Sequence, residues 1–331
     1  MLTRALLVAS LVAATLAVPA TASTAPCVLL LGSYPAEVSA NLALMTLDPR
    51  QPTTLDGHEL YAGTLGGRRV VTGIAGPSPA LTGATTTLAL RHWTCINAVV
   101  FTGTAGGAGP AQLGDVAVPS RWTGDEGHHY TSIDKRALAL AKRTAAQAGK
   151  QLGTMAAVND GPCACEAVVE SVKAVPLGRT PRVVVGGNGV TFGGESNACY
   201  EQGGMLAGCN PCPPGSTGLR APVVLSLTPV LAAQAARTGL VPDARALAGL
   251  APRPGGTVGN SSTSYIADDM QTTASLAAAR ARHVPFIAFR GISDTDSVGN
   301  LWPFEYLVYQ GLAADNAAAA ARVWITAWNP R

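Results

Sequence analysis

The sequence predicts an α/β protein with a largely parallel sheet that helices cover on both faces. Three observations carry this prediction. Short apolar runs alternate with Ala- and Leu-rich stretches of helical composition, which is the pattern of strand–helix–strand units. Several apolar runs end in Gly-rich segments, as buried strands do where they enter loops. The 331 residues are 47% hydrophobic and only 13% charged, so the chain can bury a large core.

The predicted elements follow in chain order. The expected strands cover residues 27–31, 69–74, 98–102, 116–119, 182–185 and 285–289, and the expected helices cover 81–91, 135–149, 272–281 and 304–327. Ligands bind at the carboxyl ends of the strands in such sheets. The Gly-rich ends at Gly32, Gly73, Gly103 and Gly187 are therefore expected to be walls of one site.

Residues 193–262 interrupt this alternation and are rich in Gly, Pro and Cys, which indicates an insertion within one domain. The chain has seven cysteines, at positions 27, 95, 163, 165, 199, 209 and 212. In an oxidising compartment we expect disulfides, and the odd count leaves at least one thiol unpaired or intermolecular. The Cys209–Cys212 spacing alternatively suits zinc or a redox pair.

The amino terminus has the pattern of a secretory signal. Arg4 precedes an apolar stretch over 5–18, and Ala20-Thr21-Ala22 matches the small-residue pattern of a cleavage site. The stretch is shorter than the roughly 20 residues that span a membrane. We therefore expect residues 1–22 to be removed and the mature protein to be secreted or periplasmic, with no membrane attachment. Lipid attachment at Cys27 is the alternative, and Pro26 argues against it.

Charge and motifs exclude several classes of partner. The formal net charge is +3, and no basic stripe is present, so nucleic acid is not expected to bind. Neither the GxxxxGK[ST] phosphate loop nor a GxGxxG after the first strand occurs, which argues against ATP and dinucleotides. His128-His129, with Asp125 and Glu126 nearby, indicates a polar loop rather than a metal site. We expect neither a metal nor a cofactor.

The most informative local signal is Arg290-Gly291-Ile292-Ser293-Asp294, directly after the strand expected at 285–289. Asp269-Met270-Gln271 precedes the helix expected at 272–281. An acid at the end of a buried strand is placed where function is common. Residue chemistry alone leaves a second interpretation open, in which Arg290 and Asp294 cap a helix or form a surface pair.

Five segments together carry a resemblance to a known family. They are Gly32-Ser33-Tyr34-Pro35-Ala36-Glu37-Val38, Thr102-Gly103-Thr104-Ala105-Gly106-Gly107, Leu113-Gly114-Asp115-Val116, Asp269-Met270 and Arg290-Gly291-Ile292-Ser293-Asp294. In these the chain resembles the purine and uridine phosphorylase superfamily, most closely its methylthioadenosine/S-adenosylhomocysteine nucleosidase branch, over about residues 27–325. The secretory signal and residues 183–190 also resemble the plant bark and vegetative storage proteins of that superfamily.

The resemblance implies a fold, an assembly and an activity. The fold is a three-layer α/β/α nucleoside phosphorylase-like domain over 26–331, with a mixed, largely parallel central sheet, and the assembly is a homodimer. The activity is cleavage of the N-glycosidic bond of a purine nucleoside. Asp294 would protonate the leaving purine, with Ser293 orienting it. Glu37 would activate a water on the other face of the sugar, and Arg290 and Thr104 would position that water.

The resemblance also places the substrate. The purine would lie against the backbone near Val190 and Thr191, above Ala105 and Gly106. Met270 would pack under the ribose. Trp302 or Phe304 would form a wall for the 5′ substituent. The segments 32–38 and 102–111 contain no Arg or Lys to hold a phosphate dianion, so water is the expected nucleophile and phosphorolysis is the alternative.

Gln271 departs from the family pattern. The resemblance predicts Glu here, where its carboxylate accepts hydrogen bonds from the ribose hydroxyls. A neutral amide stabilises positive charge on the sugar less well, at a cost of about 1.5–3 kcal/mol, or one to two decades in rate. Asp268 or Asp269 is a candidate to compensate. A substrate with a modified sugar is one alternative, and a non-catalytic purine-binding or storage protein is another.

Overall fold

The structure is a computed structural model that describes residues 25–76, 78–124, 129–156, 175–192, 265–295 and 304–329. Four sequence predictions lie outside these residues: the signal segment 1–22, the insertion 193–262, the polar residues Asp125, Glu126 and His128, and Trp302. The cysteines at 163, 165, 199, 209 and 212 also lie outside them. For Phe304 only the backbone is described.

Thirteen strands of the described part form one mixed sheet. They are β1 (Cys27–Gly32), β2 (Thr46–Leu47), β3 (Thr53–Leu55), β4 (His58–Leu65), β5 (Arg68–Ile74), β6 (Ile96–Gly107), β7 (Val116–Val118), β8 (Arg121–Thr123), β9 (Thr131–Ser132), β12 (Val183–Val185), β13 (Asn188–Thr191), β14 (Ala267–Asp269) and β15 (Phe286–Thr295). A separate small hairpin consists of β10 (Met155–Ala156) and β11 (Val175–Pro176).

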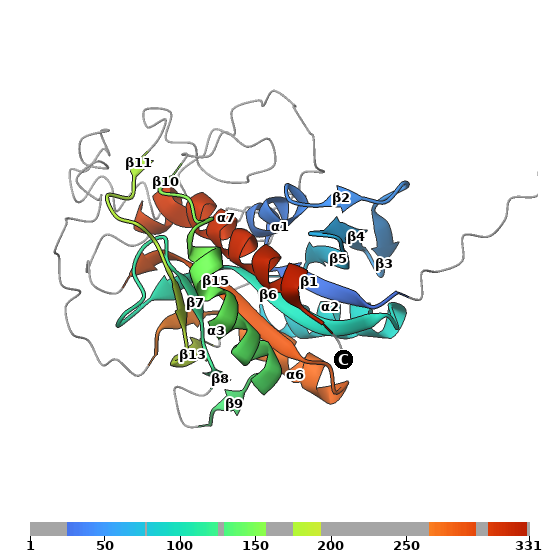
Figure 1. Cartoon of the computed structure of the whole chain (residues 1–331). Helices are drawn as coiled ribbons and strands as arrows, with labels where there is room; N and C mark the ends of the chain where they lie inside the picture. Colours follow the sequence, from blue (N-terminus) through green and yellow to red (C-terminus); the bar gives the residue numbers. More distant parts are fainter. Residues whose placement is uncertain are drawn as a thin grey trace, which may run out of the picture.

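The centre of the sheet is parallel, and β6 is its hub. β1 pairs in parallel with β5 and with β6, and β15 pairs in parallel with β6 along its length. The far end of β6 also pairs with β14, which runs antiparallel to it. The carboxyl ends of β1, β6, β14 and β15 therefore share one region. Figure 1 shows β15 beside β6.

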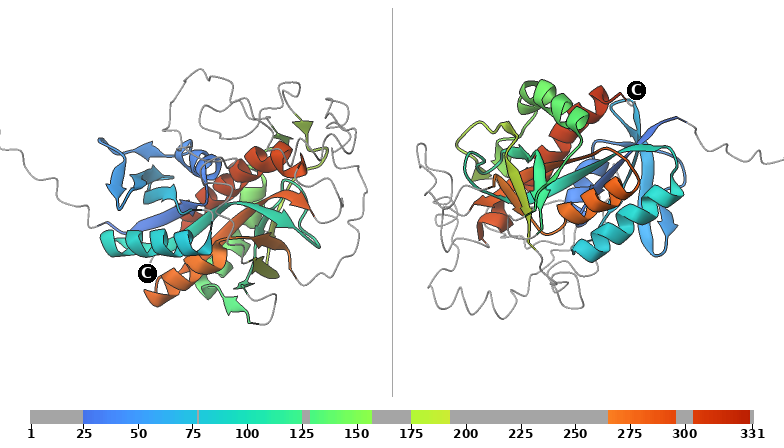
Figure 2. Two further views of the ribbon diagram at one scale, coloured as in Figure 1. Left: turned by 180° about the vertical axis from the view of Figure 1, so that it is seen from behind. Right: turned by 90° about the horizontal axis from the view of Figure 1, so that it is seen from below.

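Helices cover both faces of the sheet. They are α1 (Pro35–Leu42), α2 (Pro79–His92), α3 (Lys135–Gly149), α6 (Thr272–Ala281) and α7 (Phe304–Ala327). α7 packs against β15 and β6 and also contacts α1 and α3. α2 and α6 lie side by side on the opposite face (Figure 2). This is the three-layer α/β arrangement with a mixed central sheet that the sequence predicts.

Local chemistry explains where the helices begin. Ser78 caps α2 by accepting from the Leu81 N–H at 3.3 Å, and Asp134 caps α3 by accepting from the Ala137 N–H at 2.8 Å. Pro35 supplies the first turn of α1. No helix of the described residues is long and apolar enough to cross a membrane.

The predicted strand positions are confirmed, but two predicted ends are wrong. Residues 103–107 are the last part of β6 rather than a loop, and residues 290–294 belong to β15 rather than following it. Both stretches continue because each pairs with the other, from Arg290 opposite Gly103 to Thr295 opposite Gly107. The fold therefore places two of the resemblance segments on adjacent strands.

A disulfide joins the amino ends of β1 and β6. Cys27 and Cys95 are bonded, and the Cys27 N–H also donates to the Cys95 carbonyl at 2.9 Å. In this pairing the Cys27 sulfur is bonded to Cys95 and is not a free thiol. The remaining core is apolar and includes the fully buried side chains of Phe101, Trp122 and Trp324.

Candidate active site

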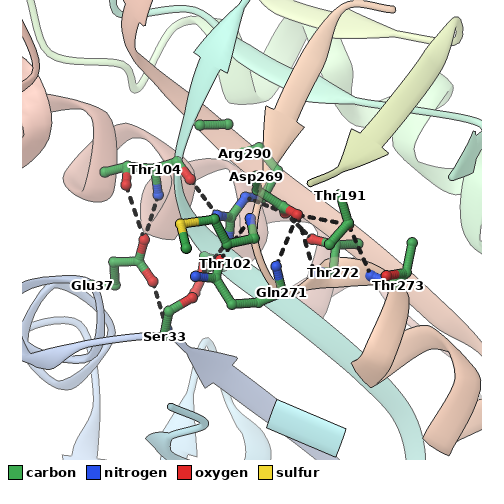
Figure 3. Close-up of polar contacts among 12 residues, drawn as sticks. Ser33, Glu37, Thr102, Thr104, Thr191, Asp269, Gln271, Thr272, Thr273 and Arg290 are labelled. Carbon is green, nitrogen blue, oxygen red and sulfur yellow. Dashed lines mark hydrogen bonds and ion pairs between the residues drawn. The ribbon is translucent and has the colours of Figure 1, made fainter. Parts of the chain in front are cut away.

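Glu37 lies in the first turn of α1, and its carboxylate is held against the ends of β1 and β6 (Figure 3). The Ser33 N–H donates to Oε2 at 2.5 Å, and the Thr104 N–H donates to Oε1 at 2.6 Å. The Thr104 hydroxyl donates to the same Oε1 at 3.1 Å. Only 1% of Glu37 is exposed. Three donors from two segments thus fix a carboxylate that is shielded from bulk water.

Two glycines make room for this carboxylate. A Cβ on Gly103, which has a φ of +140°, would overlap the carboxyl group of Glu37. A Cβ on Gly32 would come within 2.9 Å of the Glu37 Cβ. These two predicted glycines do line the site. Gly73 and Gly187 do not, because Gly73 packs against Leu60 and Gly187 against Ile266.

Burial is the main influence on the protonation of Glu37. It raises the pKa of the carboxyl above its ordinary value of 4.5, while Arg290 and the hydrogen bonds from Ser33 and Thr104 act in the opposite direction. A carboxylate with a raised pKa binds a proton more readily than an exposed glutamate. This is the property that a general base needs.

Arg290 lies on β15 and is 1% exposed, which excludes the interpretation that it belongs to a helix cap or a surface pair. Its Nη1 donates to the Thr102 carbonyl at 3.3 Å, and its Nη2 donates to the Thr104 carbonyl. Its Nε lies 3.2 Å from Oδ2 of Asp269. The guanidinium therefore sits between Glu37 on one side and Asp269 on the other, tied to the backbone of β6 (Figure 3).

Asp269, at the end of β14, organises the other half of the site. Its Oδ1 accepts from the Thr191 hydroxyl at 2.8 Å and from the N–H groups of Gln271 and Thr272 at 3.1 Å each. Its Oδ2 accepts from the Thr272 hydroxyl and pairs with Arg290. Since both oxygens are engaged within the protein, Asp269 is not the replacement for a ribose-binding carboxylate that the sequence suggested.

Gln271 is 7% exposed and lies between β14 and α6, beside the partly buried Met270. Its carboxamide Oε1 lies 3.3 Å from the Met270 N–H. Asp268, on the same strand, packs against Gly106, because a Cβ on that glycine would overlap the Asp268 carboxylate. Gln271 thus adjoins Asp269, and Asp268 adjoins the Gly106 position with which Asp294 pairs.

Asp294 and Ser293 lie near the end of β15. The Ser293 hydroxyl donates to Oδ1 of Asp294 at 2.7 Å and lies 3.3 Å from the Ala105 carbonyl oxygen. Asp294 pairs with Gly106 of β6, two residues beyond Thr104. Glu37 and Asp294 therefore meet β6 at positions about 7 Å apart along the strand.

Val190 and Thr191 end β13, and both are buried. The residue that follows was missed in the sequence. Phe192 is 45% exposed, and its ring lies edge-on to Tyr265 with the centroids 6.4 Å apart. Its N–H donates to the Asp269 carbonyl at 2.7 Å, which ties it to the site. A large aromatic residue directly after Val190 and Thr191, which the resemblance places against the purine, was the available signal.

Two further residues that the sequence analysis did not predict, Tyr34 and Gln310, connect the site with α7. The Tyr34 hydroxyl lies 2.9 Å from the Thr104 hydroxyl and 3.5 Å from the carboxamide oxygen of Gln310. Tyr34 is 5% exposed and Gln310 is 2% exposed.

Among the described residues, no group of three or more His, Cys, Asp or Glu side chains could hold a metal ion.

Comparison with known proteins places the chain in a family. A family model described as the phosphorylase superfamily matches residues 28–191. The uncharacterized protein Rv2293c of Mycobacterium tuberculosis is 33% identical over 216 residues, which cover 62% of this chain and 86% of that protein.

Solved structures share the fold at low sequence identity. A 5′-methylthioadenosine/S-adenosylhomocysteine nucleosidase from Colwellia psychrerythraea, in complex with adenine, has a TM-score of 0.54 at 17% identity and covers 91% of this chain and 95% of its own. The corresponding nucleosidase from Neisseria meningitidis, bound to methylthio-immucillin-A, has a TM-score of 0.55 at 14% identity, with 91% and 99% covered. Futalosine hydrolase of Helicobacter pylori has a TM-score of 0.56 at 12% identity, with 93% and 100% covered.

Proposed function

The chain belongs to the phosphorylase superfamily, and from this premise we propose that it hydrolyses the N-glycosidic bond of a purine nucleoside. The observation that carries the proposal is Glu37. It is a fully buried carboxylate that three donors hold beside a buried arginine, and no structural need of the fold explains it. Placing such a charge in the interior is costly, which is typical of a functional site.

The chemistry needs two carboxyl groups with opposite roles. As the bond breaks, the sugar gains oxocarbenium character and the purine must leave without a full negative charge. Asp294, held by Ser293, donates a proton to the purine ring. Glu37 takes a proton from the attacking water, which lies near Thr104 and Arg290. The approach of the two carboxyl groups to different points on β6 leaves space between them for the sugar and the water.

The contacts that Arg290 makes within the protein favour water over phosphate as the nucleophile. Phosphorolysis requires cationic donors that are free to hold a dianion. Arg290 donates to the Thr102 and Thr104 carbonyls and forms an ion pair with Asp269, and Glu37 adds a negative charge beside it. A phosphate dianion would meet repulsion here, whereas a water would find both an acceptor and donors.

We propose an adenine nucleoside with a 5′-thio substituent as the substrate class. The support is the resemblance in sequence, together with neighbours whose structures hold adenine or methylthio-immucillin-A. The exposed Phe192 offers an aromatic face for a purine next to Val190 and Thr191.

The test measures free base released from methylthioadenosine, adenosylhomocysteine, adenosine and inosine. Glu37→Gln and Asp294→Asn each remove one proposed proton transfer and should lower kcat by about two to four decades. Asp48→Asn is the matched control, because Asp48 is a carboxylate paired with Arg69 outside the site. Purine binding by calorimetry without release of base from any of these nucleosides would replace the enzymatic proposal with a binding role.

We also propose that the protein is exported and acts as a homodimer. The disulfide between Cys27 and Cys95 supports export, because such bonds persist in oxidising compartments. A fusion of residues 1–30 to a phosphatase that folds only outside the cytoplasm tests export, and light scattering of the mature protein tests the dimer. A fusion protein that is made but stays in the cytoplasm without phosphatase activity would contradict export, and a monomeric mass would contradict the dimer.

A further inference from the structure

A line of buried polar side chains leads from α7 to Glu37. Gln310 lies on α7, Tyr34 just before α1, and Thr104 on β6, and each is at most 6% exposed. The distances along the line are 3.5 Å from Gln310 to the Tyr34 hydroxyl, 2.9 Å from there to the Thr104 hydroxyl, and 3.1 Å from there to Oε1 of Glu37.

Counting protons gives this line a direction. An ionised carboxylate only accepts, so the single hydroxyl proton of Thr104 goes to Glu37. The oxygen of Thr104 is then an acceptor, and the single phenolic proton of Tyr34 goes to it. Tyr34 therefore has no second proton to give to Gln310.

Gln310 must then donate to Tyr34. With its carboxamide oxygen facing the phenol, its Nε2 is a buried donor without a hydrogen-bond partner among the described residues. Such a donor costs about 1–3 kcal/mol. The two ends of a carboxamide have the same shape, so turning it over places Nε2 against the phenolic oxygen and removes the orphaned donor. The carbonyl that is left unpaired instead is better tolerated.

We infer that Gln310, Tyr34 and Thr104 form a one-way chain of hydrogen-bond donors that ends on Glu37 and positions it as the base. The kinetic consequence rests on the proposed function. Tyr34 and Gln310 are positioning residues, since they act on Glu37 through Thr104. Each donor favours the ionised carboxylate, and the chain therefore opposes the effect of burial.

The other groups around Glu37 do not replace the chain. β15 contributes the charge of Arg290, which is shared with Asp269 of β14. β1 and β6 contribute the N–H groups of Ser33 and Thr104. On α7, the neighbour of Gln310 is the buried Tyr309.

The test compares Tyr34→Phe and Gln310→Leu with the unchanged protein. Loss of a donor should move the acidic limb of the kcat/KM profile to higher pH by about half a unit to one unit. Gln310→Glu should move it further, because a carboxylate beside Tyr34 draws the phenolic proton away from Thr104. Tyr61→Phe is the matched control. It removes a hydroxyl bonded to Glu59 from another buried tyrosine that packs on α1, and should leave the limb in place.

A second readout separates this inference from the proposed reaction. The protein is labelled with ¹³C in its glutamate carboxyl groups, and the Glu37 signal is identified by its loss in Glu37→Gln. Its titration should shift upward in Tyr34→Phe and Gln310→Leu even if no nucleoside is cleaved. An unchanged titration in both variants, with thermal unfolding showing that they are folded, would overturn the chain. A shift in Tyr34→Phe alone would remove Gln310 from it.

Discussion

The two ends of the central parallel strands differ in the side chains that surround them. At the amino ends of β1 and β6, a disulfide joins Cys27 to Cys95, and Trp328 stacks on Trp324 while its Nε1 donates to Asn97 at 3.0 Å. At the carboxyl ends the same strands surround ionisable groups, Glu37 and Arg290, each 1% exposed. The amino end contributes stability. The carboxyl end buries ionisable groups at an energetic cost, and this contrast supports the proposal that it is the functional end.

Among these changes, removal of Arg290 at the carboxyl end should destabilise the protein most. Arg290→Met leaves Asp269 and Glu37 buried without their cation, and should lower the free energy of unfolding by about 3–5 kcal/mol. Chemical denaturation measures this loss. The control Arg143→Met removes an exposed arginine of α3 and should change stability by less than about 0.5 kcal/mol. Equal effects of the two changes would show that the buried ion pair is not needed.

Removal of the disulfide should affect the amino end alone. The Cys27→Ser/Cys95→Ser double variant should lose about 2–4 kcal/mol of stability, because the bond closes a loop of 68 residues in the unfolded chain. Below its unfolding temperature, the variant should keep the kcat/KM of the unchanged protein. A large loss of kcat/KM in a variant that is still folded would contradict the separation of the two ends.

A carboxylate at position 271 should increase kcat/KM. Gln271→Glu supplies the charged acceptor that the family pattern predicts, and should raise kcat/KM by about one to two decades. Gln147→Glu adds the same charge on the exposed side of α3 and should have no effect. If Gln271→Glu leaves the rate unchanged or lowers it, the residue does not act on the sugar.

The smallest expected effect is on the pH dependence of stability. Burial raises the pKa of Glu37, so the folded state keeps this proton to higher pH than the unfolded chain. The favourable contribution is complete below the ordinary value of 4.5 and is lost as pH rises through the folded pKa. Relative to Glu37→Gln, the free energy of unfolding should therefore fall with rising pH, by at most ~1.4 kcal/mol per unit. A difference that grows with pH would contradict the sign.

Patterns that are local in sequence predicted most of the fold. The helices α6 and α7 match their predicted bounds, and the buried strands are where the apolar runs are. The ends of β6 and β15 were wrong because glycines at 103–107 have the composition of a loop. They form strand because β15 pairs alongside, and glycine at 103 leaves room for the Glu37 carboxylate. α1 has only eight residues directly after a strand, too few for a periodic pattern.

The resemblance placed Glu37, Thr104 and Arg290, and the fold brings these three together. The resemblance could not show that both carboxylate oxygens of Asp269 contact groups of the protein. The residues that provide these groups lie as far apart in sequence as Thr191 and Arg290. Tyr34 and Gln310 are 276 positions apart, and no local pattern connects them. Partners of buried polar groups depend on the tertiary structure, and they are the part of a site that sequence reasoning reaches last.

Glu37 is proposed to activate water rather than to accommodate phosphate. The most direct measurement is the identity of the sugar product when the mature protein acts on methylthioadenosine in an excess of phosphate. We predict free methylthioribose, at a rate that does not change with phosphate concentration. A sugar 1-phosphate, formed at a rate that rises with phosphate concentration, would contradict the proposed role of Glu37.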